Sequence, residues 1–368
     1  MKRWMTVLAS LFLAGPLASG CGSKDPAAPP LPPSADRDGD GIPNGEDAFP
    51  DDPARFGRYA PVTLARLGGT FGAAVAINDA NVAVGLSDDG TGSLKAVRWA
   101  VDGAPVALEP LPGGSHSAAY GIGEDGTVVG ESEKATGTTV AVTWPAGTTA
   151  AAELGLGAFA APAAAYGISG TRVVGEATNA GQPVAVVWTL AVDAPVPLTG
   201  LGGASSSAYF IRGDTVVGES TNAAGEGRAV LWKLDATGTP SGAPLELAPL
   251  DGHVASVALG VNTSGDVVGE SEPASGEAHA VVWAAGASGV PGPPLDLGTG
   301  SASAVNDLER VAGHGGAPDQ PSLWDLRNTS IADAILAGSS PGGQVYGMNG
   351  ASVMVGTADG QGFAALPQ

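Results

Sequence analysis

The sequence of 368 residues contains one cysteine and four histidines, and only 5% of its side chains are aromatic. A single cysteine cannot form a disulfide within the chain, so the fold must be stable without covalent cross-links. Lysine and arginine number 16 against 37 aspartates and glutamates, which gives a formal net charge of −21. Nucleic-acid binding requires a basic surface, and we therefore expect no nucleic-acid partner.

Glycine and proline are abundant, at 58 and 29 residues, and apolar residues make up 43% of the chain. Most of these apolar residues are alanine and valine. This composition is typical of many short strands joined by tight turns rather than of long helices. The length would allow two or three ordinary domains, but the composition favours one large all-β domain.

The N-terminus has the features of an export signal. Residues 1–17 are basic at the start and then apolar, but the apolar run is too short to span a bilayer, and small residues follow before Cys21. Segment Leu17–Cys21 (LASGC) resembles a bacterial lipobox, which implies that residues 1–20 are a signal peptide and that the lipidated Cys21 anchors the protein to a membrane. Among bacterial lipoproteins, a residue other than aspartate after the lipidated cysteine, here Gly22, implies sorting to the outer membrane or the cell surface. The alternative is an ordinary signal peptide followed by an incidental cysteine.

Residues 21–35 become proline-rich, cannot pair into a sheet and are predicted to form an extended tether. Residues 36–53 then follow the spacing of a calcium loop, in which oxygen ligands alternate along the chain and a glycine allows a sharp turn. The predicted ligands of a structural Ca²⁺ ion are the side chains of Asp36, Asp38, Asp40, Asn44 and Asp47 and the carbonyl of Ile42.

This loop departs from an EF-hand, because Asp47 stands where a bidentate glutamate is usual and no helical sequence flanks it. Its pattern Asp-x-Asp-x-Asp-Gly-Ile-Pro-Asn-x-x-Asp-x-x-Pro resembles a thrombospondin type 3 repeat. Segment 36–52 holds seven acidic residues and one arginine, so without a cation it should repel itself and stay open. The alternative is an acidic linker that is only solvated.

From Tyr59 onward the chain repeats one unit. A Val-Val-Gly motif or a variant of it recurs seven times at intervals of 43 to 51 residues, and in six units a tryptophan follows 11 to 14 residues later. We expect the tryptophans to fill the spaces between neighbouring sheets, and the glycines to mark places where another backbone comes close. The glycines are Gly85, Gly130, Gly175, Gly218, Gly269, Gly313 and Gly356, and the tryptophans are Trp99, Trp144, Trp188, Trp232, Trp283 and Trp324.

Each unit contains four short apolar segments separated by turn residues. In the second unit these segments cover residues 118–122, 127–131, 140–144 and 152–154. The Asp125-Gly126 pair between the first two is a hairpin signal. Four strands per unit form the blade of a propeller. We therefore predict an all-β, seven-bladed β-propeller of four-stranded blades over residues 59–368.

The two ends of the repeat complement each other. Residues 61–69 match the fourth-strand segment of other units, such as residues 195–203, although they precede the first complete unit. The last unit stops at Leu366, after its third strand. We therefore predict that the N-terminal strand pairs with the last blade, which closes the ring and hides two sheet edges. An open β-solenoid is the alternative.

Three motifs recur in a fixed order along residues 59–368. They are Leu-Gly-Gly at 67–69 and 201–203, Val-Val-Gly-Glu-Ser at 267–271 and His-Ala-Val-Val-Trp at 279–283. In this order they resemble the bacterial HAF extracellular repeat family. The sequence departs from that family where an aliphatic residue replaces phenylalanine, and only Phe363 keeps the aromatic ring. The resemblance implies a repeat fold and an extracytoplasmic location, and it implies no activity.

Four units carry a glutamate directly after the motif glycine, at Glu131, Glu176, Glu219 and Glu270. In a closed propeller we expect these carboxylates around one mouth of the ring, where they would face a cation or a basic partner. The alternative is that they are solvated or locally hydrogen-bonded strand ends. His116 and His253 are expected in blade-crossing loops of the same face but on opposite sides of the ring, and their spacing does not form a metal site.

The sequence shows no nucleophile elbow, phosphate loop or catalytic cysteine, and we expect no catalysis. The predicted function is that of an exported, lipid-anchored scaffold that binds a protein or glycan partner. One alternative is a polysaccharide-acting hydrolase or lyase with an active site on the axis, and another is a purely structural envelope protein. The five tyrosines and four histidines stand singly in their units, which argues against the enzyme.

Overall fold

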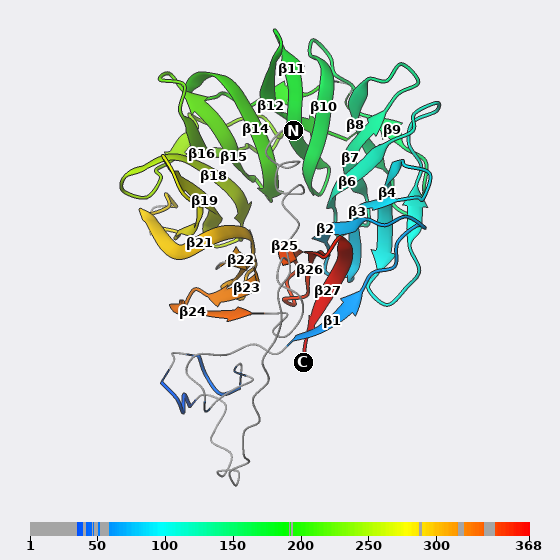
Figure 1. Cartoon of the computed structure of the whole chain (residues 1–368). Helices are drawn as coiled ribbons and strands as arrows, with labels where there is room; N and C mark the ends of the chain where they lie inside the picture. The colour runs from blue at the N-terminus through cyan, green and yellow to red at the C-terminus, as the bar shows by residue number, and fades with distance from the viewer. Residues whose placement is uncertain are drawn as a thin grey trace.

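The computed structural model describes residues 35–39, 42–45, 47, 51, 59–190, 192, 194–286, 289–315, 320–334 and 343–368. These residues form 27 β-strands and no α-helix, so the prediction of an all-β chain is confirmed. The sheets stand around a central axis, and each extends outward from it (Figure 1). This arrangement is a β-propeller of four-stranded blades.

The second repeat unit shows how the sequence forms a blade. Its strands are β6 (Ser117–Ile122), β7 (Val128–Glu133), β8 (Thr139–Trp144) and β9 (Ala152–Glu153), and each pairs antiparallel with the next. The predicted turn between β6 and β7 has Gly126 at φ 86°, a conformation that glycine adopts without steric penalty. The four strands match the four segments expected from the repeat.

The other units repeat this order, from an inner strand beside the axis to an outer strand. Their strands are β2 (Gly72–Ile77), β3 (Val82–Asp88), β4 (Leu94–Ala100), β5 (Val106–Leu108), β10 (Ala160–Ser169), β11 (Arg172–Asn179), β12 (Gln182–Thr189), β13 (Val196–Pro197), β14 (Gly202–Arg212), β15 (Thr215–Asn222), β16 (Gly227–Lys233), β17 (Leu245–Leu247), β18 (His253–Val261), β19 (Val267–Pro273), β20 (His279–Trp283), β21 (Pro294–Val305), β22 (Arg310–Gly315), β23 (Gln320–Asp325), β24 (Asn328–Ala334), β25 (Gly343–Met348), β26 (Met354–Ala358), β27 (Gln361–Pro367) and β1 (Tyr59–Thr63).

The described strands form six hydrogen-bonded sheets, which differs from the seven separate blades that the sequence predicts. Five sheets contain four strands, and the sixth contains seven, from β18 to β24. Strand β21 joins this sheet, because residues 294–299 pair with β20 whereas residues 300–305 pair with β22. The repeat pattern predicts a loop between consecutive units. Here an outer strand continues directly into the next inner strand through Gly300, at φ 134°.

The first strand of the chain lies beside the last. Strand β1 pairs antiparallel with β27, from Tyr59 opposite Pro367 to Thr63 opposite Phe363 (Figure 1). The resulting sheet has the order β1-β27-β26-β25, so β1 occupies the place of an outer strand. These are the two segments whose complementarity is visible in the sequence.

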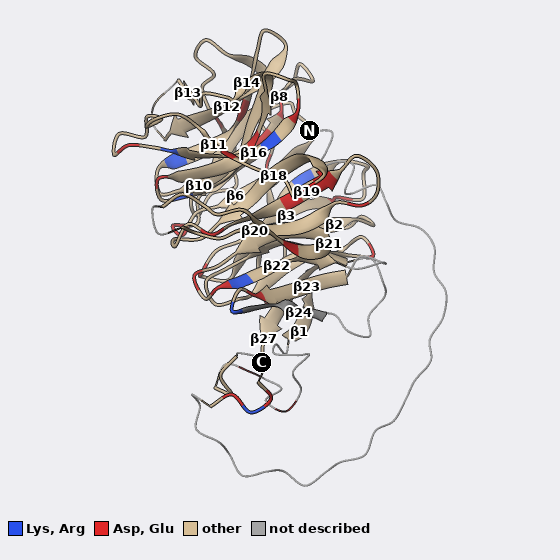
Figure 2. Ribbon diagram, turned by 90° about the vertical axis from the view of Figure 1, so that its left-hand side faces the viewer, with Lys and Arg blue, Asp and Glu red and all other residues tan. Residues whose placement is uncertain are grey.

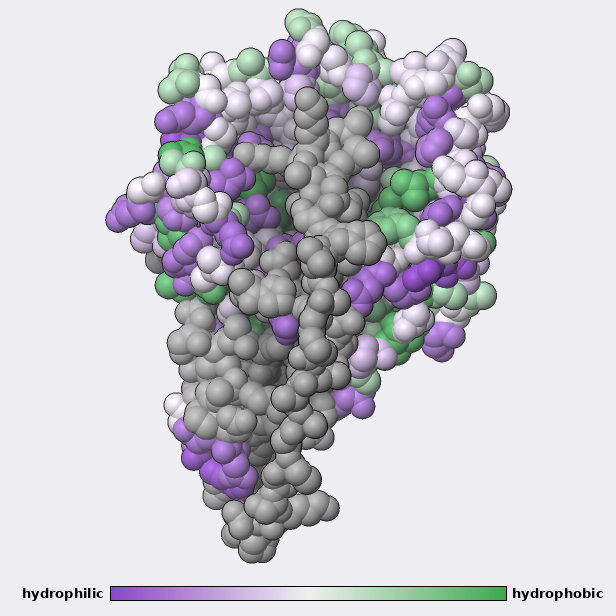
Figure 3. All heavy atoms as spheres, viewed as in Figure 1, coloured by the Kyte–Doolittle hydropathy of each residue, from purple (hydrophilic) through white to green (hydrophobic). Residues whose placement is uncertain are grey.

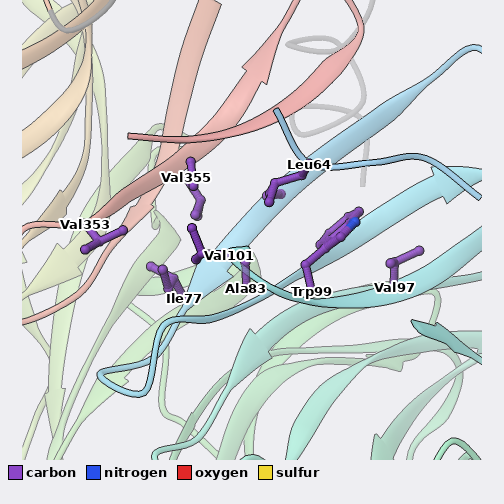
Figure 4. Packing of buried hydrophobic residues seen from close by; sticks show 10 residues of the cluster. Leu64, Ile77, Ala83, Val97, Trp99, Val101, Val353 and Val355 are labelled. Atoms are coloured by element: carbon purple, nitrogen blue, oxygen red, sulfur yellow. The ribbon is translucent and has the colours of Figure 1, made fainter. Parts of the chain in front are cut away.

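The hydrophobic core consists of clusters between neighbouring blades. Eight clusters of buried residues lie between neighbouring repeat units, and together they cover seven contacts between units, one of which contains two clusters. One of these clusters joins the two ends of the repeat, because it packs Ala83 of β3 and Trp99 of β4 against Leu64, Val353 and Val355 (Figure 4). Burying one large apolar side chain such as leucine or valine contributes about 1.5–3 kcal/mol to the free energy of folding.

The six repeated tryptophans are buried, as predicted, with at most 2% of each side chain exposed. In five of them the indole nitrogen donates a hydrogen bond of 2.7 to 2.8 Å to a backbone carbonyl 33 to 35 residues earlier. In Trp188, for example, the acceptor is the carbonyl of Gly155, just after the outer strand of the preceding blade. Each of these tryptophans therefore forms a hydrogen bond between its own blade and the preceding one.

A β-bulge occurs at the same place in every repeat unit, where the inner strand pairs with the second strand. The residue skipped by the pairing is Val75, Tyr120, Tyr166, Tyr209, Leu259, Ser303 or Tyr346. The motif glycine lies next to this bulge, and a Cβ atom there would overlap a backbone carbonyl oxygen of the inner strand. The prediction that these glycines mark a close backbone approach is confirmed, and the bulge is its cause.

Asparagine side chains link the inner hairpin turns at one end of the axis, which we call the hairpin end. Asn262 donates to the carbonyl of Asn306 at 3.3 Å, Asn306 to Asn349 at 3.2 Å, and Asn349 to Asn78 at 3.1 Å. Asn78 in turn donates to the carbonyl of Gly123 at 3.1 Å. All four asparagines are buried, so these bonds are shielded from water. The opposite end, where the chain crosses from blade to blade, is the crossing end.

Several predictions fall outside the described residues, namely the signal peptide, the lipidated Cys21, most of the tether and Asp40. Within the part of the chain that the structure describes, no helix has the length and apolar character needed to cross a membrane.

Candidate functional site in the axial channel

The seven bulge residues line one cavity on the axis, which we call the axial channel. Its volume is about 970 Å³. Inner strands from all repeat units contribute to its wall, and the hairpin turns line it at the hairpin end. Glu270, Glu272, Ser301 and His314 line it towards the crossing end. A bulge interrupts the alternation of side chains along a strand, and this is how the same repeat position supplies the wall each time.

Three tyrosines from consecutive blades form one side of the channel, which we call the tyrosine wall. The ring centroids of Tyr120 and Tyr166 are 5.5 Å apart, and those of Tyr166 and Tyr209 are 5.6 Å apart. The rings are inclined to each other by 51° and 54°, within the range of favourable aromatic pairs. Tyr346, from the last blade, also lines the channel.

The single occurrence of tyrosine in each unit is therefore no argument against a shared site. Each is the single tyrosine of its unit, but the propeller brings the same inner-strand position of every unit to the axis. The signal was present in the sequence, because Tyr120, Tyr166 and Tyr346 all stand between a small or β-branched apolar residue and a glycine. The period that places the glycines and tryptophans also aligns these tyrosines.

Glu131 lies directly beside the tyrosine wall. The hydroxyl of Tyr120 donates a hydrogen bond of 3.0 Å to Oε1 of Glu131. Burial raises the pKa of the Glu131 carboxyl; the bond from Tyr120 opposes this shift and the neighbouring Glu176 adds to it. Burial and the same carboxylates also raise the pKa values of Tyr120 and Tyr166 well above the usual value, so both phenols remain protonated.

The four predicted glutamates are not equivalent. Glu176 accepts a hydrogen bond from the hydroxyl of Ser207 on the next inner strand, and its charge acts on Tyr120 and Tyr166, as does that of Glu131. Glu270 is one of the residues that line the channel. Glu131, Glu176 and Glu219 are not among the lining residues, and the Glu219 carboxylate lies near Gly227. The structure thus places Glu131 and Glu176 next to the tyrosines, Glu270 on the channel wall, and Glu219 apart from both.

The histidines form local contacts rather than a shared site. His116 lies 3.4 Å from Glu133, whose carboxylate also accepts bonds from the hydroxyl and backbone nitrogen of Ser115. His253 packs edge-on against His279 with ring centroids 5.1 Å apart, a pair that the sequence spacing did not suggest. Strand pairing brings these two histidines together, because β18 and β20 flank β19 in one sheet.

The described part of the predicted calcium loop is docked on the propeller. Ile42, expected to offer its carbonyl to the ion, has a fully buried side chain that packs with Val345, Met354 and Phe363. The backbone nitrogen of Arg37 bonds to the side-chain oxygen of Asn44 at 3.1 Å, so this oxygen already has a donor. No group of three or more histidine, cysteine, aspartate or glutamate side chains among the described residues is arranged to hold a metal ion.

Charged side chains at the hairpin end stabilise the turns. Asp79 accepts a bond of 2.7 Å from the backbone nitrogen of Gly350, and Glu124 accepts one of 3.0 Å from the backbone nitrogen of Asp79. Arg212 forms an ion pair with Asp307, which is also bonded to Thr263. These groups are engaged in joining neighbouring turns, whereas the tyrosine wall and its carboxylates lie further along the channel.

The outer surface offers no broad apolar face among the described residues. Acidic residues are distributed over several strands and loops of the propeller rather than gathered in one place (Figure 2). Hydrophobic residues form separate small patches between hydrophilic ones on the face shown in Figure 3. The exposed large apolar residues are mainly single valines such as Val192 and Val254. Isolated residues of this kind are normal for a protein surface, so the axial channel is the candidate site.

No protein-family model and no curated protein matches this chain. Among solved structures, it resembles one of two prolyl endopeptidases at 14% identity and a TM-score of 0.50, covering 72% of this chain and 42% of that one. It also resembles TolB from Acinetobacter baumannii at 12% identity and a TM-score of 0.43, covering 78% and 63%. The propeller domain of the Trilobed protease from Pyrococcus furiosus matches at 9% identity and a TM-score of 0.47, covering 82% and 89%. At these identities the similarities concern the fold alone, and the chain spans less than two thirds of the first two structures.

Proposed function

We propose that this protein is an exported binding scaffold whose ligand enters the axial channel. The observation that carries the proposal is the channel itself, because one cavity of about 970 Å³ unites the bulge residues of all repeat units with several carboxylates. Ligand sites are typically concave, with an apolar or aromatic wall and a few polar groups. The tyrosine wall beside Glu131 and Glu176 has this composition.

The scaffold that we propose is a closed ring of seven blades. Seven equivalent bulges and seven contacts between neighbouring repeat units support this count. The change of partner within β21 divides the seven-stranded sheet into two blades. The pairing of β1 with β27 supports closure. So does the bond from Asn349 to Asn78, which spans 271 residues. A closed ring holds the channel residues of different blades at fixed separations.

We further propose that Cys21 is lipidated and holds the protein on the cell envelope, as an outer-membrane or surface lipoprotein of the HAF repeat type. Replacing Cys21 with serine should release the protein from membranes into the soluble fraction. Continued pelleting of this variant with membranes would contradict the anchor.

Calcium binding by residues 36–47 remains a proposal that rests on the spacing of the acidic residues. Calorimetric titration of the mature chain with CaCl₂ should show binding that Asp38→Ala removes. Absence of heat at millimolar calcium, with an unchanged melting temperature, would end this part of the proposal.

A polysaccharide-acting enzyme is the second candidate, and the convergence of tyrosines and carboxylates on the axis is the observation that favours it. The contact between Tyr120 and Glu131 joins an acid to a phenol, both of which can transfer protons. If the protein releases unsaturated or reducing ends from envelope polysaccharides and Tyr120→Phe loses this activity, the enzyme proposal is correct and the binding-scaffold proposal is wrong.

Two variants test the binding proposal. Ser303 lines the channel, so Ser303→Trp should obstruct it, whereas Val192→Trp places the same bulk on the outside, where Val192 is 55% exposed. We expect a panel of glycans, peptides and small cations to contain binders that Ser303→Trp loses and Val192→Trp keeps. If binding to every member is absent, or survives in Ser303→Trp, the channel is not the ligand site.

A further inference from the structure

We infer that the ligand of the axial channel is an organic cation, an alkylammonium or guanidinium group, held at the tyrosine wall. This inference rests on the proposed function, because it names the chemical class that the same channel takes. Three properties of the channel carry it: the aromatic wall, the carboxylates next to that wall, and the position of the one arginine among the lining residues.

The aromatic wall provides the first part of a cation site. Tyr120, Tyr166 and Tyr209 follow one another around the axis at 5.5 and 5.6 Å and line the cavity together. The face of an aromatic ring carries negative charge and attracts a cation within about 6 Å, more strongly where water is excluded. Several rings side by side also offer apolar surface to the carbon chain that bears the cation.

The carboxylates provide the second part. Glu131 is bonded to the Tyr120 hydroxyl and Glu176 to the Ser207 hydroxyl, and a neutral hydroxyl leaves the negative charge in place. A carboxylate accepts several hydrogen bonds, so each can still bind an ammonium group. Glu270 lines the channel one blade beyond Tyr209. Negative charges that lie together in a half-buried site are stabilised by a cation between them.

The distribution of basic residues shows which end of the channel the cation occupies. Arg212 is the one lysine or arginine among the described lining residues, and it is paired with Asp307 at the hairpin end. At that end the lining residues Asp79 and Glu124 accept hydrogen bonds from backbone nitrogens of the turns. No lysine or arginine among the described lining residues stands beside the carboxylates at the tyrosine wall, so a cation there meets no fixed positive charge of the lining.

The size of the site and the chemical groups around it favour an organic cation over a metal ion or a neutral sugar. The described residues provide no group of three metal-binding side chains, and a volume of about 970 Å³ suits a molecule of many atoms. A neutral glycan would stack on the tyrosines, but it would bring no positive charge to the carboxylates. An ammonium group matches both the rings and the carboxylates.

Spermidine is the first probe, and a lysine tripeptide is the second; they separate a free polyamine from a basic peptide as the source of the ammonium group. Calorimetry on the mature chain with Cys21→Ser should show binding of one or both.

Glu176→Gln keeps an acceptor for Ser207 and should weaken binding about tenfold or more, as should Glu270→Gln. Tyr166→Ala should weaken it, and Tyr166→Phe should retain it because the ring remains. Asp102→Asn removes the same charge at an exposed turn and should have no effect.

The outcomes separate this inference from the function on which it rests. If a neutral oligosaccharide binds, Ser303→Trp abolishes that binding and spermidine and the lysine tripeptide give no heat, the organic cation is wrong while the channel remains the ligand site. If Asp102→Asn weakens spermidine binding as much as Glu176→Gln does, the binding is unspecific attraction to an acidic protein and the inference is overturned. If no probe binds through the channel, the proposed function itself fails.

Discussion

The side-chain amide of Asn349 donates a hydrogen bond of 3.1 Å to the backbone carbonyl of Asn78, which lies 271 residues earlier in the chain. Asn349 is buried, and its side-chain oxygen also accepts bonds from the backbone nitrogens of Ala351 and Val353. One residue thus shapes its own hairpin turn and joins the last repeat unit to the first. This contact and the β1–β27 pairing together keep the two ends of the chain in place around the channel.

Replacing Asn349 with alanine should lower the free energy of unfolding by about 1–3 kcal/mol, because buried polar groups of two blades lose their partner. Urea denaturation measures this change. Asn222→Ala is the matched control, since Asn222 accepts the same kind of turn bonds from Ala224 and Glu226 without reaching another blade. An equal loss in both variants would mean that the contact between blades adds nothing.

Gly130→Ala should destabilise the protein by about 1–3 kcal/mol, because the new Cβ atom would overlap the carbonyl oxygen of Ala118 and disturb the bulge that carries Tyr120. Thermal unfolding measures the effect. Gly292→Ala serves as control, since the nearest atom to its Cβ would be the Ala284 oxygen at 3.7 Å. Similar melting temperatures for the two variants would show that the repeated glycine is not required by the bulge.

Glu133 should contribute to acid sensitivity. Hydrogen bonds from Ser115, and then from His116, lower the pKa of the Glu133 carboxyl from 4.5 to about 2. Because the folded pKa is the lower one, the stabilisation is present above pH 4.5 and is lost as the pH falls towards 2. Melting temperatures measured from pH 6 to pH 3 should therefore fall less steeply for Glu133→Gln than for the natural protein. Parallel curves would contradict the lowered pKa.

Ile42→Ala should lower the free energy of unfolding by about 2–4 kcal/mol, because it leaves a cavity against Val345, Met354 and Phe363. Denaturation of the full mature chain measures this. Val192→Ala, at a side chain that is 55% exposed, should change stability by less than about 0.5 kcal/mol. A negligible effect of Ile42→Ala would show that the acidic loop does not dock on the propeller.

The regular features of the fold could be predicted from the sequence because they depend on short-range patterns. The period of Gly130 and Trp144 fixes the strands of a blade, and the spare segment at Tyr59 identifies a partner for the incomplete last unit. The continuous strand β21 was not predicted, since its two halves read as separate segments on either side of Gly298 and Gly300.

The site was predicted only in part. The repeat singled out Glu131, Glu176 and Glu270, but which of the glutamates lie at the tyrosine wall or line the channel depends on the twist of each blade and on contacts such as that between Glu176 and Ser207. The tyrosine wall depends on the bulge at Tyr120 and its equivalents, a backbone irregularity that periodicity does not reveal. The burial of Ile42 depends on how the loop meets the ring, which no local pattern encodes.

A designed disulfide tests the closed ring most directly. Ala60 pairs with Leu366, and both side chains are half-buried, so cysteines at these two positions in a Cys21→Ser background should oxidise to a bond within one chain. Peptide mass spectrometry should identify the linked segments in a monomer. The offset pair Ala60→Cys and Ala365→Cys, whose side chains face opposite sides of the sheet, should remain reduced. Free thiols in the first variant, or equal linkage in the second, would contradict the ring and the channel that it encloses.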